Sequence, residues 1–420
     1  MHISMALLSA AMFFVLAGVF MGVQLELDGT KLVVDTASDI RWQWVFIGTA
    51  VVFFFQLLRP AFQKGLKSVS GPKFILPAID GSTVKQKLFL VALLVLAVAW
   101  PFMVSRGTVD IATLTMIYII LGLGLNVVVG LSGLLVLGYG GFYAIGAYTF
   151  ALLNHYYGLG FWTCLPIAGL MAAAAGFLLG FPVLRLRGDY LAIVTLAFGE
   201  IIKNLVNAVF LGRDADGFHI SFKDSMSLGL KDGGEVLIKG PQGITGTPQA
   251  ATFTIGIILV LITLIIVMNL VNSRTGRAIM SIRDNRIAAE SIGINITKYK
   301  LLAFSISAAL AGVAGVLYAH NLTTLTALPK NFGYNMSIMI LVYVVLGGIG
   351  SIRGSVISTV ILYLLPELLR GLNNYRMLIY AIVLILAMLF NSAPQFITLR
   401  KRIFGGLKPQ HAAHSGKEEA

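Results

Sequence analysis

Two long stretches of this chain contain no Asp, Glu, Lys or Arg, and they limit what the chain can fold into. The first runs from Ile111 to Leu184 and the second from Gly240 to Ser273. A helix needs about 20 apolar residues to cross the hydrocarbon core of a bilayer, so the first stretch alone has room for three crossings. Only 12% of the 420 residues are charged, whereas soluble domains have about 25%. The chain is therefore predicted to be an all-α polytopic membrane protein.

Hydropathy predicts about 12 transmembrane helices, as a ten-span core preceded by two N-terminal spans. The first apolar run is interpreted as a retained span, because no Lys or Arg precedes it and no A-x-A site ends it. The glycine-rich run from Gly122 to Tyr148 is expected to be a broken or re-entrant helix, either one helix or two spans. The spans are placed near residues 4–23, 42–58, 88–104, 111–130, 133–154, 161–184, 190–211, 251–272, 300–320, 335–350, 355–369 and 376–394.

The distribution of basic residues predicts the orientation of these spans. Alternate threading of 12 spans places both termini on one side, whose loops and tails hold 20 Lys and Arg residues against ten on the other side. Short loops rich in Lys and Arg stay in the cytoplasm. We therefore expect both termini to be cytoplasmic. The same distribution explains the net charge of +13 without a nucleic-acid partner.

The chain is expected to have three parts. Residues 1–87 form a two-span extension with a basic cytoplasmic linker, residues 88–400 form the transmembrane domain, and residues 401–420 form a basic, disordered cytoplasmic tail. The polar loop over residues 212–240 is too short for a domain. It either caps the outer mouth and touches a soluble partner, or it is a connector without a specific role.

A short charged segment follows the span that ends near Asn272. Asp284 is a candidate N-cap for a helix over residues 285–292, and Gly293 suits the left-handed residue that ends a helix. Thr297 is expected to cap the next span. The short helix cannot cross a membrane, and it carries small apolar residues between charged flanks. Such a helix either docks in a groove of another protein or lies on anionic lipid.

Several runs of this sequence carry a family resemblance. RDNRIAAESIGIN, which starts at Arg283, resembles the cytoplasmic EAA coupling loop of ABC-transporter permeases. The runs GLSGLLVLGYGGFYAIGAYTFALL, LRLRGDYLAIVTLAFGEIIKNLV and LVYVVLGGIGSIRGSVI are similar to characteristic runs of the branched-chain amino-acid permeases. The resemblance covers residues 88–400 in order. The two additional N-terminal spans resemble the longer of that family's two permease types.

The resemblance implies a permease subunit of a binding-protein-dependent ABC importer for Leu, Ile and Val in the bacterial inner membrane. Its implied partners are a second permease subunit, two cytoplasmic ABC ATPases and a periplasmic amino-acid-binding protein. The chain has no G-x-x-x-x-G-K-[ST] motif, so ATP and Mg²⁺ are expected only in the partner subunits, and the chain is expected neither to be an enzyme nor to bind a cofactor. Within the coupling loop 273–299, the expected ATPase contacts are Arg283, Asp284, Asn285, Ala288, Ala289, Glu290 and Gly293.

The glycine-rich run is also the expected substrate path, because broken helix ends offer backbone polar groups to a zwitterion. Tight helix packing through small residues is the alternative. Glu200 and Lys203 lie three residues apart within one span, where ionisable groups are costly. They form either a mutually neutralised structural pair or a gate or substrate contact. The expected path residues are Asn126, Ser132, Tyr139, Tyr143 and Glu200.

Three other functions compete with this one. An ion-coupled secondary transporter would need more intramembrane acids than Glu200 and Glu367. A membrane enzyme would need clustered catalytic or metal-binding groups, but the six histidines are scattered and the one cysteine, Cys164, builds neither a disulfide nor a metal site. A permease of the same architecture for a sugar, urea or an amide is the nearest alternative. The sequence does not specify the preferred amino acid or the partners' sequences.

Overall fold

A computed structural model of the chain describes about two thirds of it, in a series of segments separated by gaps. The chain consists of two compact units, Met1–Ala78 with Thr398–Ala420, and Ile79–Ile397. The described residues are 24–28, 31–35, 46, 49–50, 106–186, 188–214, 217–223, 228–229, 235–247, 253–369 and 378–385.

In the first unit, strands β1 (Gln24–Asp28) and β2 (Lys31–Asp35) form an antiparallel pair in which Leu25 faces Val34. Several predicted segments lie outside the described residues in whole or in large part, so they remain predictions. These segments are the spans at 4–23, 42–58, 88–104 and 376–394, the basic linker and the C-terminal tail.

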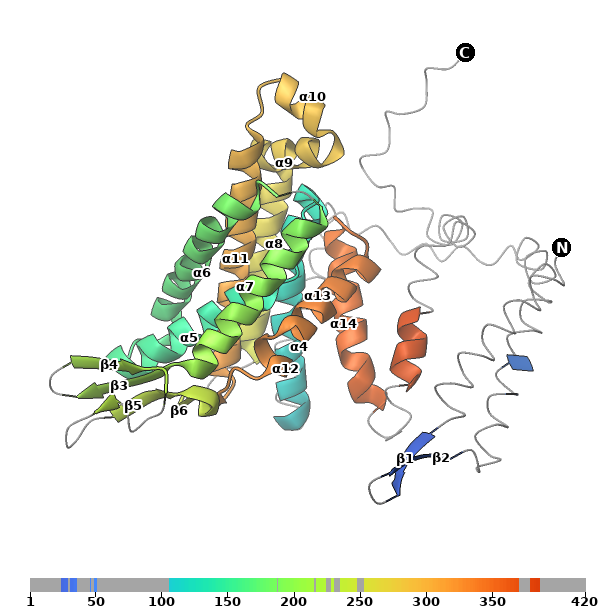
Figure 1. Ribbon diagram of the computed structural model, residues 1–420. Helices are drawn as coiled ribbons and strands as arrows, with labels where there is room; N and C mark the ends of the chain where they lie inside the picture. Colours follow the sequence, from blue (N-terminus) through green and yellow to red (C-terminus); the bar gives the residue numbers. More distant parts are fainter. Residues whose placement is uncertain are drawn as a thin grey trace, which may run out of the picture. The chain divides into compact units, whose positions relative to one another are not determined.

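The second unit is a helical bundle (Figure 1). Its helix α4 continues directly into a π-helical turn, η3, and a non-helical stretch then separates η3 from α5. The helices are α4 (Arg106–Asn126), η3 (Val127–Leu131), α5 (Tyr139–Tyr157), α6 (Phe161–Val183), α7 (Asp189–Ala208), α8 (Phe253–Asn272), α9 (Arg274–Asp284), α10 (Arg286–Ser291), α11 (Ile296–His320), α12 (Pro329–Phe332), α13 (Tyr334–Gly347) and α14 (Ile352–Leu368).

Five helices in the described part of the chain are long and apolar enough to cross a membrane, which supports the prediction of a polytopic helical protein. The prediction of a complete span near 335–350 differs from the structure. Helix α13 has 14 residues, and a helix of that length is about 21 Å long, shorter than the roughly 30 Å hydrocarbon core. The candidate crossings are 107–131, 161–183, 189–208, 253–272 and 296–320.

Helix α11 lies at the centre of the bundle, packed against α4, α5 and α6. Small residues allow this close approach, as is usual between membrane helices. A β-carbon on Gly146 of α5 would lie only 2.2 Å from the carbonyl oxygen of Gly312 in α11. A β-carbon on Gly312 would lie 2.6 Å from that of Ala172 in α6. By contrast, α6, α7 and α8 expose apolar side chains along their lengths.

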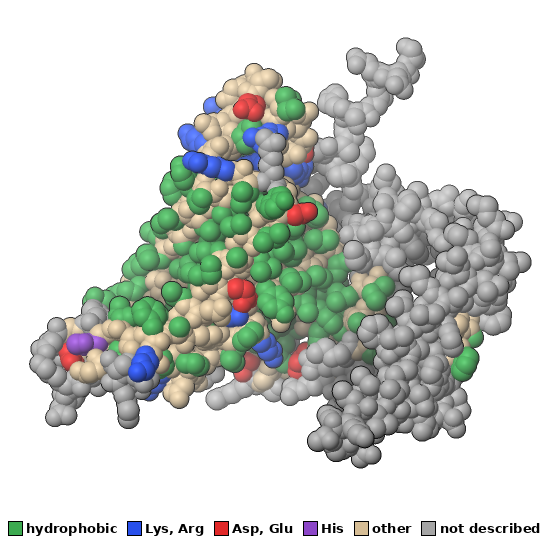
Figure 2. All heavy atoms as spheres, viewed as in Figure 1, with side chains coloured by type: hydrophobic (Ala, Val, Ile, Leu, Met, Phe, Trp, Pro, Cys, Tyr) green, Lys and Arg blue, Asp and Glu red, His purple; other side chains and the backbone are tan. Residues whose placement is uncertain are grey.

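The loop after α7 contains strands, so the all-α prediction is wrong for this part of the chain. Strands β3 (Phe210–Asp214), β4 (Gly217–Ser221) and β5 (Glu235–Lys239) form an antiparallel sheet in the order β4-β3-β5. A second short pair joins β6 (Ile244–Thr245) to β7 (Thr324–Leu325). The sheet and the α9–α10 turn lie at opposite ends of the bundle (Figure 1). Lys and Arg side chains cluster around the α9–α10 end, and others lie at the sheet end (Figure 2).

Candidate functional site

The corner between α8 and α9 is fixed by one serine and one glycine. The hydroxyl of Ser273 accepts a 3.0 Å hydrogen bond from the amide of Gly276 and donates a 2.7 Å bond to the carbonyl of Leu270. A β-carbon on Gly276 would lie 2.0 Å from that same carbonyl oxygen, so only glycine permits the turn. Ile279 and Ile282 bury the inner face of α9. Helix α9 is therefore held firmly on the end of α8.

Helix α10 is shorter than predicted and has a different N-cap. The side chain of Asn285 accepts a 3.1 Å hydrogen bond from the amide of Ala288, whereas Asp284, the predicted cap, is the last residue of α9. Both residue types suit an N-cap, and the break in the helix one residue later decides between them. Gly293 has a φ of +85°, as the sequence predicts for the residue that ends this helix.

The following helix, α11, is capped by Asn295 and not by Thr297, the predicted cap. The side chain of Asn295 accepts a 3.0 Å hydrogen bond from the amide of Lys298. Thr297 is already inside the helix, as its second residue. Two asparagine caps therefore bracket the sequence that contains α10, and each satisfies an amide that would otherwise lack an acceptor.

The surface of α10 carries two isoleucines that point away from the bundle. Ile287 is 81% exposed and Ile292, just after the helix, is 74% exposed. Ala288 and Glu290 are also exposed, but Ala289 is 2% exposed. Of the two alanines predicted to contact an ATPase, Ala288 is therefore accessible and Ala289 is buried. Ile287 is absent from the predicted contact set, although an apolar residue among charged ones could have indicated it.

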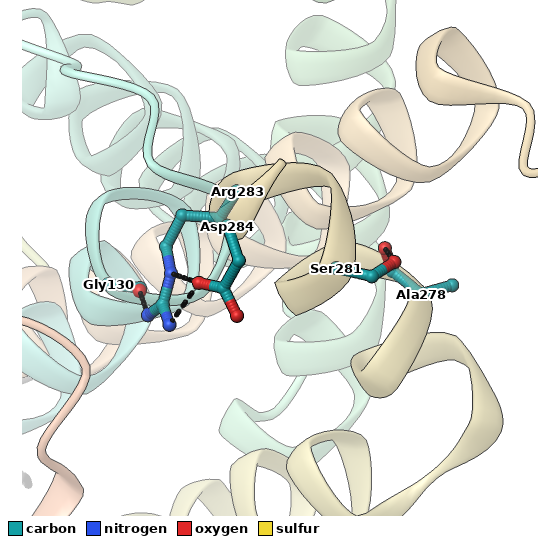
Figure 3. A network of polar contacts seen from close by, with 5 residues as sticks. All are labelled: Gly130, Ala278, Ser281, Arg283 and Asp284. Atoms are coloured by element: carbon teal, nitrogen blue, oxygen red, sulfur yellow. Dashed lines mark hydrogen bonds and ion pairs between the residues drawn. The ribbon is translucent and has the colours of Figure 1, made fainter. Parts of the chain in front are cut away.

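Arg283 turns its side chain toward the bundle (Figure 3). Its Nη1 donates a 2.7 Å hydrogen bond to the carbonyl of Gly130 in η3. Its Nε and Nη2 donate to one carboxylate oxygen of Asp284, at 2.9 Å and 2.8 Å. Of the predicted contact residues, Asp284 and Asn285 remain exposed, as does Gly293. Arg283 is exposed as well, and its guanidinium also joins α9 to the end of the α4–η3 helix.

The non-helical stretch over residues 133–138, here termed the helix break, interrupts the glycine-rich run in which a broken helix was predicted. It begins where the hydroxyl of Ser132 donates a 2.6 Å hydrogen bond to the carbonyl of Val128, which also accepts from the amide of Leu134 at 3.2 Å. It ends where the amide of Leu137 donates a 3.1 Å bond to the hydroxyl of Thr195 in α7. The break therefore connects the end of η3 with α7.

Four predicted path residues lie inside the protein with partners there. Asn126 accepts a hydrogen bond from the amide of Gly350, and Ser132 bonds within its own helix end. The hydroxyl of Tyr139 donates a 2.9 Å bond to the carbonyl of Ser307, and the ring of Tyr143 packs against other aromatic rings. Their burial agrees with the alternative of tight helix packing. Exposed positions occur within the break itself, at Gly133 and Leu135.

Glu200 and Lys203 form the ion pair that their spacing predicts. The Lys203 ammonium donates a hydrogen bond to one carboxylate oxygen of Glu200. The other oxygen accepts a 2.8 Å bond from the amide of Tyr334, the first residue of α13. Glu200 therefore joins α7 to the amino end of α13, where a negative charge is favourable. These contacts favour the structural interpretation of the pair.

No group of three or more His, Cys, Asp or Glu side chains in the described ranges is arranged to hold a metal ion. Cys164 is buried inside α6. Several polar contacts of this unit join different elements to one another. The two features that they position are the α9–α10 segment (residues 274–291) and the helix break.

Comparisons with known proteins match almost the whole chain. A family model described as the permease component of branched-chain amino acid transport systems matches residues 107–388, and one described as a domain of unknown function matches residues 1–100. The chain is similar to two high-affinity branched-chain amino acid transport system permease proteins named LivM. It is 64% identical to that of Escherichia coli (strain K12) and 61% identical to that of Salmonella typhimurium (strain LT2), and each alignment covers 93% of both chains.

A more distant similarity links the chain to a second permease. LivH of Escherichia coli (strain K12), also named a high-affinity branched-chain amino acid transport system permease protein, is 26% identical over 260 residues. That alignment covers 60% of this chain and 80% of LivH. No solved structure matches the chain.

Proposed function

The chain belongs to the family of branched-chain amino acid transport permeases, and on that premise we propose that it is the LivM-type subunit of an ABC importer for Leu, Ile and Val. The family role is that of a transport subunit without an ATPase of its own. In the proposed complex, this chain and a LivH-like permease together form the translocation path. Two cytoplasmic ATPases use ATP and Mg²⁺, and a periplasmic binding protein delivers the amino acid.

One observation carries the coupling part of this proposal: two isoleucines project from the tip of the α9–α10 segment. This tip extends beyond the helices of the bundle, where it is accessible to a partner protein (Figure 1). Burial of an exposed Ile contributes about 1.5–3 kcal/mol. Docking of Ile287 and Ile292 in a groove of an ATPase would supply that stabilisation, with Ala288 and Glu290 beside them.

The same proposal assigns an orientation. The α9–α10 end carries the basic residues of the coupling loop, and the positive-inside rule places that end in the cytoplasm. The β3–β4–β5 sheet then faces the periplasm, where the binding protein delivers its amino acid. Both termini are cytoplasmic if the chain has 12 spans, including the two N-terminal spans and those near 88–104 and 376–394.

We place the substrate path along the helix break. Irregular backbone at membrane depth is tolerated only where protein buries it or where it lines a water-filled cavity. Gly138 lies against Thr195, about 9 Å along α7 from its first residue, so the break enters the span. Within the described ranges, the amides of Leu135 and Val136 have no hydrogen-bond partner. Val136 is buried, whereas Leu135 is exposed, so the Leu135 amide offers a polar contact to a zwitterion and its side chain offers an apolar wall.

In this arrangement the buried residues of the glycine-rich run support the path without lining it. Asn126 and Tyr139 hold the ends of the flanking helices through bonds to Gly350 and Ser307. Ser132 closes the last turn before the break, and Tyr143 fills the core behind it. Glu200 fixes α13 to α7.

Uptake by proteoliposomes tests the proposed function. Vesicles that contain this chain, its second permease and both ATPases are loaded with ATP and Mg²⁺ and given binding protein and labelled leucine outside. We expect accumulation that requires ATP hydrolysis and is competed by Ile and Val. Accumulation driven by an imposed pH or sodium gradient, without the ATPases, would contradict the proposal in favour of a secondary transporter. Competition by a sugar or urea, and not by Ile or Val, would contradict the substrate class.

A further inference from the structure

Arg283 is the last arginine of α9, and its side chain points away from the exposed tip of α10. We infer that Arg283 is a positioning residue that transmits movement of the α9–α10 segment into the helix break. The inference rests on the proposed function, because it assumes that a partner moves this segment. It assigns Arg283 a role distinct from direct contact with an ATPase.

The guanidinium of Arg283 caps the carboxyl end of the α4–η3 helix from outside. The last carbonyls of a helix lack donors within the helix, and this end has partial negative charge that favours a cation. Nη1 of Arg283 donates to one of these carbonyls, that of Gly130, at 2.7 Å. Asp284 accepts from Nε and Nη2 and thereby orients the guanidinium, which leaves Nη1 for Gly130 (Figure 3).

Close contacts connect Arg283 with the start of the break. Gly133, the first residue of the break, has a φ of +67°, and a β-carbon there would lie 2.9 Å from Cγ of Arg283. A β-carbon on Gly130 would lie 2.6 Å from the amide nitrogen of Gly350, in the loop between α13 and α14. Because Gly130, Gly133 and Gly350 have no side chains, Arg283, the end of η3 and this loop pack directly against one another.

The other end of the break is attached to α7. The amide of Leu137 donates to the hydroxyl of Thr195, and a β-carbon on Gly138 would lie 1.6 Å from the Thr195 carbonyl oxygen. The break is therefore attached at one end to α9, through Arg283, and at the other end to α7. A displacement of α9 relative to α7 that keeps both attachments changes the conformation of residues 133–138.

The firm connection between α8 and α9 allows movement of α10 to reach Arg283. Because Ser273 and Gly276 fix α9 on the end of α8, a force applied at α10 tilts α9 instead of bending its first turn. The π-helical turn before the break is a suitable place for change, since π-helical turns are rare and occur frequently at functional sites. Movement of the α9–α10 segment thus changes the conformation of the break and the exposure of Leu135.

The test uses the complete transporter in proteoliposomes, with the only cysteine of this chain replaced by Cys164→Ala. A reporter introduced by Leu135→Cys is added for the labelling assay alone, because Leu135 lies in the proposed substrate path. Arg283→Ala and Arg283→Lys are compared with wild-type Arg283. Arg277→Ala is the matched control, because Arg277 lies in the same helix and donates to a carbonyl at its base, that of Asn272. Three quantities are measured: ATPase co-purification, leucine transported per ATP hydrolysed, and maleimide labelling of position 135 with and without ATP and vanadate.

With Arg283→Ala we expect the ATPases to remain bound and to hydrolyse ATP. The leucine transported per ATP should fall by about tenfold, within the usual range of coupling between sites. The ATP-dependent change in labelling at position 135 should disappear. Arg283→Lys should retain part of both, since a single ammonium can still reach the carbonyl but cannot also form the fork with Asp284. Arg277→Ala should behave as the wild type.

Two results would overturn the inference while leaving the proposed function intact. One is an unchanged leucine-to-ATP ratio and labelling response in Arg283→Ala. The other is loss of ATPase co-purification, which would make Arg283 a docking contact. If Arg283→Ala fails to accumulate in the membrane, an unchanged ratio and labelling response in Arg283→Lys overturns the inference equally. Failure of the wild-type chain to bind any ATPase would instead refute the proposed function, and the inference with it.

Discussion

The amide of Gly350 donates a 2.9 Å hydrogen bond to the side-chain oxygen of Asn126, across 224 residues of sequence. Gly350 has a φ of +82° in the loop between α13 and α14, and Asn126 is the last residue of α4. The bond therefore joins the helix before the break to the loop that contacts Arg283. It is one of several polar links that hold this end of the bundle together.

Replacement of Asn126 by alanine should destabilise the protein. The substitution removes the acceptor of the half-buried Gly350 amide from a buried position, at a cost of about 1–3 kcal/mol. Thermal unfolding of the purified protein in detergent should show a lower midpoint for Asn126→Ala. Thr149→Ala is the control, since the Thr149 hydroxyl bonds only to Ile145 in its own helix and its loss should have little effect. Equal midpoints for the two variants would contradict the assigned role of Asn126.

Replacement of Glu200 together with Lys203 tests whether this ion pair has a structural role. Glu200→Leu alone leaves the Lys203 ammonium largely buried without a counter-charge, which costs on the order of 3 kcal/mol. We expect a lower membrane level of the single variant and recovery of level and uptake in the double variant Glu200→Leu, Lys203→Met. Immunoblots of membranes and leucine uptake check both. A double variant that accumulates normally but does not transport would place the pair in the substrate path.

The contact between α5 and α11 should not tolerate a single added methyl group. In Gly146→Ala the new β-carbon would lie 2.2 Å from the Gly312 carbonyl, so the two helices must separate. Overpacking of this kind typically costs about 1–3 kcal/mol. Gly107→Ala is the matched control, because a β-carbon at Gly107 has no atom within 4 Å. The unfolding midpoints of the two variants should differ, and a stable Gly146→Ala protein would contradict this packing.

The parts of the fold that depend on local pattern could be predicted from sequence. Uncharged apolar runs indicate membrane helices because each such helix satisfies its own backbone in lipid. Glycines between 122 and 148 indicate an interruption, and Gly293 indicates the end of α10. The choice of Asn285 over Asp284 as N-cap could not be predicted, since both side chains accept equally well and the end of α9 decides.

Other parts depend on contacts between residues that are distant in sequence. The inward direction of Ala289 and the outward direction of Ile287 follow from how α10 rests on its neighbours, because both residues suit either face of a two-turn helix. The contact of Arg283 with Gly130 joins residues 153 positions apart, so no local sequence pattern indicates it. The β3–β4–β5 sheet was missed because its short strands lie in a glycine-rich polar loop without clear alternation.

The central claim is that the exposed isoleucines of the α9–α10 segment dock an ATPase, and binding of purified ATPase to the permease pair tests it most directly. Ile287→Asp places a charge where an apolar contact is proposed, and Ile287→Leu keeps the apolar contact. Because burial of Ile contributes about 1.5–3 kcal/mol, we predict that Ile287→Asp raises the Kd by roughly 10- to 100-fold while Ile287→Leu changes it little. The same Kd for all three proteins would contradict the claim.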